Sequence, residues 1–328
     1  MVIERCIYLE QPSEWKDALT GIKHAFAHTW GNCHAMHLTT GYSTYLYTFE
    51  KDGVRIVCPI AERTFGEFSD IVTPYGFSGF VGNRPCPEFS NYWKGFVQEK
   101  GYICGYIGLN PIFEESSYFE SKDVFIHNKL HIMDLSLSSD NLYKNLSSNR
   151  KRQLRYFEKD QENFFLDRPI LIEFFLNNFH DFIRERKASA VYEFSLDTLS
   201  FLLNLENSLL VGIMDGGRVI AVTVFVYTPY VGDFLFNVSL PDGKPYSVSL
   251  LWYGVNYLKS IGVPYLNLGG GVRENDSLDL FKRRFGANLY PLMALKQVYQ
   301  PEIYKELCQQ VHVNANDRSG FFPPYHRV

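Results

Sequence analysis

The chain has 328 residues, 46% of them hydrophobic and 21% charged, which provides enough apolar surface for packed cores and excludes a disordered composition. Its formal net charge of −4 disfavours extensive polyanion binding, so we expect no nucleic-acid partner. No stretch approaches the roughly 18–20 uninterrupted apolar residues of a membrane span, and the N-terminus lacks the apolar core of a signal peptide.

The first half opens with a predicted helix over residues 12–29, then a hairpin over 45–60 and a loop rich in glycine and aromatic residues over 70–83. A helix over 87–100 and strands near 102–109 and 124–135 follow. The polar stretch 136–149 is rich in Ser and Asn and marks the expected boundary between domains. We therefore expect one domain at 1–139 and a second at 140–328.

The second half repeats the hairpin of the first. Asp52-Gly53 and Asp215-Gly216 are hairpin turn signals 163 residues apart, each followed by an Arg two residues after the first Gly. Around the second hairpin (209–226), the sequence predicts a basic helix at 149–159, helices at 169–187 and 196–204, and a strand at 233–240. A loop at 241–247, an amphipathic helix at 248–262, a strand at 264–271 and a helix at 277–285 follow.

Two segments of this half carry residues suited to chemistry. The loop with Gly243 and Lys244 leads into a helix whose first amides lack internal acceptors, which suits a pyrophosphate, although a plain β–α connection fits the spacing as well. The second segment, LNLGGGVRENDSLDLFKRRFGA (266–287), places three glycines after a strand and Lys282 midway along a helix that Asp276 or Ser277 can cap. Its alternative interpretation is a surface helix with a solvated Lys282.

Cysteine and histidine patterns indicate neither a disulfide framework nor a metal site. The six cysteines are scattered without Cys-x-x-Cys spacing, as is typical of reduced, mostly buried thiols in a cytoplasmic protein. His24 and His28 lie four residues apart, but no Glu flanks His24, so we expect no metal. We expect a cytoplasmic protein without membrane insertion, and the sequence leaves its oligomeric state open.

The element order of the second half resembles the GNAT acetyltransferase core. LNLGGG followed by SLDLFKRRFGA resembles the closing signature of the FemABX-like branch, whose members carry two such domains, and VTPYGFSGF in the first half is similar to that branch's aromatic-glycine loop. The resemblance implies an α/β fold of two tandem GNAT-like domains, each a mixed, mostly antiparallel sheet flanked by helices. It also implies that the second domain binds the acyl donor and the first domain lies on the acceptor side.

The resemblance further implies which residues bind and react. Lys282 matches the lysine of the family's Phe-Lys pair and would stabilise negative charge on a tetrahedral thioester carbonyl. The strand that carries Asn237, Val238 and Ser239 would pair with the pantetheine arm of acyl-coenzyme A. The amides of 243–248 would hold its pyrophosphate, and the residues of this loop assigned to the donor are Gly243, Lys244, Tyr246, Ser247 and Val248. Tyr75 and Gly76 would help to form an acceptor cleft, and Arg150 would meet acceptor phosphates.

The attacking amine also requires a base. Carboxylates of the right type are Glu193, Asp233, Glu274 and Asp276, and no feature of the sequence selects one; we group Glu274 and Asp276 with Lys282 as catalytic candidates.

Three functions are compatible with the resemblance. The first, implied by a resemblance to bacterial nucleotide-sugar N-acyltransferases among the short relatives, is a bacterial N-acyltransferase that moves an acyl group from acyl-coenzyme A to the amine of a nucleotide-linked amino sugar for surface polysaccharide synthesis. The second is an aminoacyl-tRNA-dependent transferase acting on a peptidoglycan precursor, and the third is a non-catalytic binding module on the same fold. The acidic net charge and the lack of a predicted helical-hairpin insertion favour the coenzyme A thioester.

Overall fold

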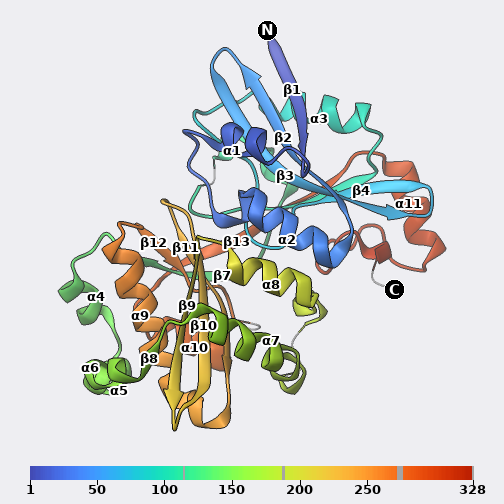
Figure 1. Cartoon of the computed structure of the whole chain (residues 1–328). Helices are drawn as coiled ribbons and strands as arrows, with labels where there is room; N and C mark the ends of the chain where they lie inside the picture. Colours follow the sequence, from blue (N-terminus) through green and yellow to red (C-terminus); the bar gives the residue numbers. More distant parts are fainter. Residues whose placement is uncertain (114, 187–188, 272–275, 327–328) are drawn as a thin grey trace. The chain divides into compact units, whose positions relative to one another are not determined.

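The computed structural model describes residues 1–113, 115–186, 189–271 and 276–326 (Figure 1). The chain divides into two compact units, unit 1 with residues 1–127 and 291–328 and unit 2 with residues 128–290. Each unit is an α/β body with a mixed, mostly antiparallel sheet, so the predicted fold class is confirmed.

Unit 1 is built on a sheet with the strand order β1-β2-β3-β4-β6-β13, to which β5 adds on β3. All neighbours are antiparallel except β4 and β6. Its elements are β1 (Val2–Tyr8), α1 (Pro12–Leu19), η1 (Phe26–His28), α2 (Trp30–Thr40), β2 (Ser43–Lys51), β3 (Val54–Phe65), β4 (Phe68–Val72), β5 (Val81–Gly82), α3 (Phe89–Glu99), β6 (Cys104–Gly108), η2 (Ser116–Tyr118), η3 (Ser121–Asp123), β13 (Asn288–Val298), α11 (Pro301–Gln310) and η8 (Pro324–His326).

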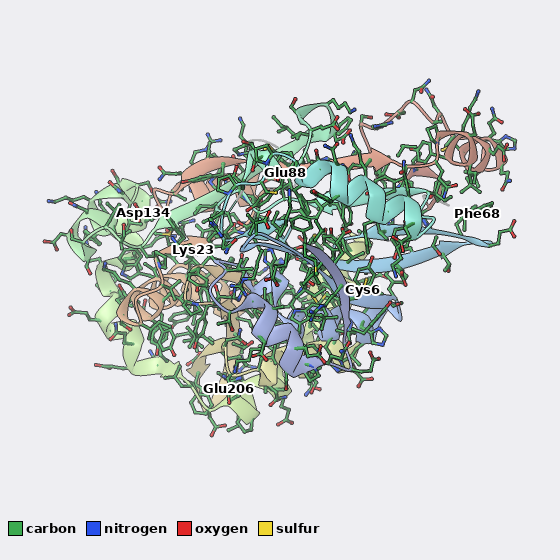
Figure 2. The ribbon with its side chains drawn as sticks, turned by 90° about the horizontal axis from the view of Figure 1, so that it is seen from above. Cys6, Lys23, Phe68, Glu88, Asp134 and Glu206 are labelled. Atoms are coloured by element: carbon green, nitrogen blue, oxygen red, sulfur yellow. The ribbon has the colours of Figure 1, made fainter. Side chains whose placement is uncertain are left out.

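Alternation along the strands of unit 1 produces a core on each face of its sheet, because successive side chains point to opposite faces. Tyr47 of β2 packs edge-on against Trp93 of α3 with 5.0 Å between ring centroids, whereas the adjacent Leu46 joins Trp15 of α1 on the other face. Lys51 at the end of β2 forms an ion pair of 2.9 Å with Glu88, which precedes α3 and is labelled in Figure 2. Both helical layers are therefore fixed to β2.

Unit 2 is built on a sheet with the order β7-β12-β11-β10-β9-β8, in which β11 and β12 form the parallel pair. Helices α7 and α8 cover one face and α9 covers the other (Figure 1). Its elements are β7 (Val124–Asp134), α4 (Ser139–Asn145), α5 (Ser148–Gln153), η4 (Leu154–Tyr156), α6 (Phe157–Asp160), η5 (Gln161–Asn163), β8 (Phe164–Phe165), α7 (Arg168–Glu185), η6 (Ala190–Tyr192), α8 (Leu196–Asn204), β9 (Ser208–Asp215), β10 (Arg218–Tyr227), β11 (Gly232–Ser239), η7 (Pro241–Tyr246), α9 (Ser247–Ser260), β12 (Tyr265–Asn267) and α10 (Ser277–Arg283).

The repeated hairpin is confirmed in both units. In β2–β3 the two residues with positive φ are Asp52 (+50°) and Gly53 (+76°), and in β9–β10 they are Gly216 (+56°) and Gly217 (+81°). Such two-residue turns need left-handed backbone at both positions, which Asp and Gly tolerate. The second turn is thus centred one residue later than its Asp-Gly signal.

The division of the chain differs from the expected boundary at 139/140. Strand β13 pairs antiparallel with β6 from Ala294–Gly108 to Val298–Cys104, which joins the C-terminal segment to unit 1. Strand β7 pairs with β12, which joins residues 128–139 to unit 2. Long-range pairing of this kind leaves no local signal in the sequence.

Several local predictions also need correction. The helix expected over 12–29 ends at Leu19, where the C-cap residue Thr20 is extended. A separate helix, α2, begins at Trp30, and the Thr29 side chain caps it by accepting from the Asn32 amide. The expected strand at 264–271 ends at Asn267. All six cysteines are free thiols, and no helix in the described residues is both long and apolar enough to cross a membrane.

Gly254 gives a direct test of packing in unit 2. A Cβ at this α9 position would lie 2.2 Å from the ring of Phe225 on β10, so Gly254→Ala is expected to destabilise the protein by about 1–3 kcal/mol through overpacking. Gly95→Ala in α3 is the matched control, because its Cβ meets open space and the change should be neutral or stabilise by up to about 1 kcal/mol. Urea unfolding measures both; equal stability of the two variants would contradict the α9–β10 packing.

Candidate functional site

The parallel strand pair of unit 2 opens after two residue pairs. Strands β11 and β12 pair only at Gly232–Leu266 and Asp233–Asn267, and beyond them β11 pairs with β10 alone among the described residues. The chain after β12 continues along β7, where the Leu268 amide donates to the His131 carbonyl at 2.8 Å and the His131 amide donates to the Gly269 carbonyl at 3.1 Å. In the part of the chain that the structure describes, the backbone edge of β11 from residue 234 to 239 therefore has no strand beside it.

A β-bulge and a buried hydroxyl mark this open edge. The register with β10 shifts from Phe225–Phe234 to Val224–Phe236, so Leu235 is the extra residue of a bulge, which bends a strand locally. The Ser239 hydroxyl is buried and has no hydrogen-bond partner in the described structure. Of the residues predicted to line a donor arm, Asn237, Val238 and Ser239 thus lie on the strand with the open edge.

The corresponding parallel pair of unit 1 stays closed. Beyond the paired residues of β4 and β6, the Thr73 amide donates to the Tyr106 carbonyl at 3.0 Å and its hydroxyl accepts from the Gly108 amide at 3.0 Å. Ser78 then forms a bridge with Leu109. Of the two parallel pairs, the one in unit 2 is open.

The segment from Gly243 to Val248 differs from its prediction. The η7 helix runs directly into α9, so the Gly243 amide donates to the Leu240 carbonyl at 3.0 Å and the Ser247 amide donates to the Lys244 carbonyl. A Cβ on Gly243 would lie 2.3 Å from the Ile220 carbonyl oxygen, so this glycine permits close packing against β10. The prediction of free amides is wrong at Gly243 and Ser247.

The other members of that segment have ordinary positions. Lys244 is exposed, Val248 is buried in the core of unit 2, and Tyr246 packs against that core.

Lys282 is buried beneath the glycine run, which rules out the solvated alternative. Its side chain is only 6% exposed, and its ammonium Nζ donates to the Gly270 carbonyl at 2.6 Å. Burial lowers the pKa of Lys282 to about 8, although the charges of Asp276 and Asp279 oppose that shift. Gly269 has a φ of +77°, and a Cβ there would lie 3.0 Å from the Lys282 ammonium, so two constraints favour glycine at this position.

Helix α10, which carries Lys282, is held by two acidic side chains. Asp276 is its N-cap and accepts from the Asp279 amide at 2.7 Å. Asp279 binds Nε2 of His131 on β7 at 2.8 Å and Arg283 at 2.9 Å. His131 was missed from the sequence because its partner is 148 residues away. Glu274 lies outside the described residues.

Asn267 connects the opening of the strands to the glycine run. Its Nδ2 donates to Asp233 Oδ1 at 3.0 Å and its Oδ1 accepts from the Gly269 amide at 2.8 Å. Burial raises the pKa of Asp233 to about 6, although the Asn267 hydrogen bond lowers it. A line of polar groups thus runs from Asp233 through Asn267 and the glycines to Lys282.

Arg150 is a structural residue, contrary to the prediction that it meets acceptor phosphates. Its guanidinium is buried and lies 4.2 Å from the ring centroid of Phe281 and 4.9 Å from that of Phe285. It donates to the Phe281 carbonyl at 3.0 Å and to Gln153 at 2.6 Å. Burial, with a smaller effect of Arg284, lowers the pKa of Arg150 to about 10. Its contacts fix the residue that precedes Lys282.

The aromatic-glycine loop belongs to unit 1. The Tyr75 carbonyl accepts from Asn32 of α2 at 3.0 Å, and Gly76 has a φ of +117° with its Cβ position 2.6 Å from that of Ala27. The close approach to Ala27 and the positive φ both favour glycine at 76. The predicted site residues are therefore divided: Tyr75 and Gly76 in unit 1, the others in unit 2.

Two surface hollows of unit 1 contain none of the predicted site residues. One, of about 230 Å³, is lined by Arg5, Glu14 and Arg55 among others, and one of about 160 Å³ is lined by Lys94, Asp123 and Gln297 among others. No cluster of three or more His, Cys, Asp or Glu side chains suited to a metal occurs within the described ranges.

Comparison with known proteins shows the fold. No family model and no curated protein sequence matches the chain. The structure is similar to that of FemX, with a TM-score of 0.71 and 10% sequence identity over 93% of this chain and 99% of FemX. It is also similar to a conserved protein of unknown function from Bacteroides thetaiotaomicron VPI-5482 (TM-score 0.61, 11% identity, 91% and 100% covered) and to L-PGS from Bacillus licheniformis (0.57, 14%, 87% and 91%). The chain has a FemX-like fold at low sequence identity.

Replacing Arg150 tests its structural role. Arg150→Met removes the donor to the Phe281 carbonyl and the buried charge beside two rings, so we expect a loss of about 1–3 kcal/mol in unfolding free energy. Arg152→Met is the control, since Arg152 is exposed and should change stability by no more than about 0.5 kcal/mol. Thermal unfolding compares them, and an unaltered melting temperature for Arg150→Met would refute the assignment.

Proposed function

We propose that the protein is an N-acyltransferase that moves an activated acyl group to an amine, with the donor lying along the open edge of β11. The observation that supports this most is the parting of β11 and β12 after Asp233, since an exposed strand edge offers amide donors and carbonyl acceptors to an extended arm that carries amides of its own. The FemX-like fold gives independent support.

The proposed donor is a coenzyme A thioester, whose chemical contribution when bound is an activated carbonyl and a thiolate leaving group. The residues fit its pantetheine arm through the β11 edge and the unpartnered Ser239 hydroxyl. They fit its diphosphate less well, because the Gly243 and Ser247 amides are engaged and Pro245 has none, which leaves exposed Lys244 as the charged contact.

In this proposal Lys282 is the electrostatic catalyst. Its ammonium is held in place by the Gly270 carbonyl and largely removed from water, so its charge is preorganised for an oxygen that becomes negative as the carbonyl turns tetrahedral. Asp276 and Asp279 support the helix that presents Lys282. Arg150 fixes the adjacent Phe281.

The proposed acceptor is the amine of a nucleotide-linked amino sugar, in a cytoplasmic step of surface polysaccharide synthesis. Tyr75 and Gly76 are the proposed acceptor contacts. The support for this finer assignment is the sequence resemblance to bacterial sugar N-acyltransferases.

An aminoacyl-tRNA donor is the second candidate. The fold is similar to that of FemX over 99% of the FemX chain, which is compatible with either donor class. An aminoacyl ester on a terminal ribose also needs no diphosphate cradle, in keeping with the engaged amides of Gly243 and Ser247. The net charge of −4 remains the argument against it.

A transfer assay with both donors tests the proposal. Purified full-length protein is incubated with acetyl- or hydroxyacyl-coenzyme A and a panel of dTDP- and UDP-amino sugars, and in parallel with charged tRNA and a peptidoglycan precursor. The first candidate predicts thiol release and coenzyme A binding by calorimetry, and the second predicts transfer from charged tRNA alone. Absence of both transfer and donor binding would contradict the proposal.

The role of Lys282 is tested in the same assay. Lys282→Met keeps the length of the side chain without its charge, and we expect kcat/KM to fall about 10²–10³-fold with an unchanged donor Kd. Arg284→Met, at the C-cap of the same helix, is the control, because Arg284 is exposed and its loss should leave transfer unaltered. Transfer by Lys282→Met at the wild-type rate would remove Lys282 from the mechanism.

A further inference from the structure

Asp233 occupies the point where the two parallel strands part. It is the last β11 residue with a partner on β12, and the β11 edge that we propose for the donor begins at the next residue. A donor arm that lies along this edge has its reactive group at one of the two ends of the stretch 234–239. Asp233 is the carboxylate at the end where β11 and β12 are still paired.

The pleat of β11 places Asp233 on the face away from α9. A Cβ on the preceding Gly232 would lie 2.7 Å from Leu258 of α9, and successive side chains of a strand alternate between faces. Asp233 therefore faces the side of the sheet on which α7 lies, and its partner on β10 is the apolar Val226. Asp233 is of intermediate exposure as a residue, Asn267 binds one of its carboxyl oxygens, and the other oxygen has no hydrogen-bond partner among the described residues.

The other described carboxylates that could serve as the base are less suitable. Asp276 caps α10, and Glu193 is exposed ahead of α8. Asp279 is already bound to both His131 and Arg283. Asp233 combines a carboxyl oxygen that no described residue binds, a neutral hydrogen-bond partner on the other oxygen and a position beside the open edge.

We infer that Asp233 is the proton acceptor for the attacking amine, an assignment that rests on the proposed function. The amine nitrogen forms its bond to the acyl carbon, and the Asp233 carboxylate takes a proton from that nitrogen. The bond from the acyl carbon to sulfur, or to the ester oxygen of an aminoacyl donor, then breaks, and the proton passes from Asp233 to the departing group. The products are an amide and a free thiol or hydroxyl. Asn267 links this carboxylate to the glycine run that holds Lys282.

Asp233→Asn tests the assignment because the amide oxygen can still accept from Asn267 but the side chain cannot take a proton. We expect kcat/KM to fall about 10²–10⁴-fold while the donor Kd and the melting temperature stay near the wild-type values. Asp233→Glu keeps a carboxylate and should recover part of the rate. Asp215→Asn, at an exposed end of β9, is the matched control and should be fully active.

The pH profile separates proton transfer from a structural role. The base must be ionised, so wild-type kcat/KM should rise with pH through about 6, the pKa to which burial raises Asp233. Asp233→Asn should lack this acidic limb. Wild-type activity and an intact acidic limb in Asp233→Asn would overturn this assignment alone, whereas no transfer by the wild-type protein would overturn the proposed function together with it.

Discussion

The candidate site depends on the way the chain leaves β12. Strand β12 has three residues, pairs with β7 at all three and with β11 at two, and the chain continues along β7 through Leu268 and Gly269. Because the chain stays with β7 after Asn267 while β11 diverges from it, the rest of β11 has no strand on that side among the described residues. The same path brings the glycine run to the Lys282 ammonium, so the open edge and the buried charge have one structural origin.

The two units share an architecture but differ at this point. Each has a hairpin, a single parallel pair and helices on its sheet, and the final strand of each sheet comes from a distant part of the sequence. In unit 1 the Thr73 hydroxyl and the Ser78–Leu109 bridge keep the parallel strands together. Together with the hydrogen bond from the Thr73 amide to the Tyr106 carbonyl, these contacts occupy the edge in unit 1 that stays open in unit 2.

Local patterns predicted much of this fold, and non-local contacts explain the errors. Helix α8 was predicted with its observed bounds, and both hairpins were predicted from their turns, since capping and positive φ act within a few residues. The errors and omissions involve residues far apart in sequence. Strand β13 pairs with β6 and β7 pairs with β12, Arg150 is buried against the rings of Phe281 and Phe285, and His131 binds Asp279. The error at Gly243 is an exception, because its amide is engaged locally by the Leu240 carbonyl three residues earlier.

The most direct test is hydrogen–deuterium exchange of β11 with and without donor. Amides of residues 234–239 that face the open edge should exchange fast in the free protein and slow on addition of saturating acetyl-coenzyme A or, for the second donor class, charged tRNA. Those of β4 in unit 1 should be unaffected. Unchanged exchange at 234–239 with a donor that supports transfer, or protection confined to β4, would contradict the account.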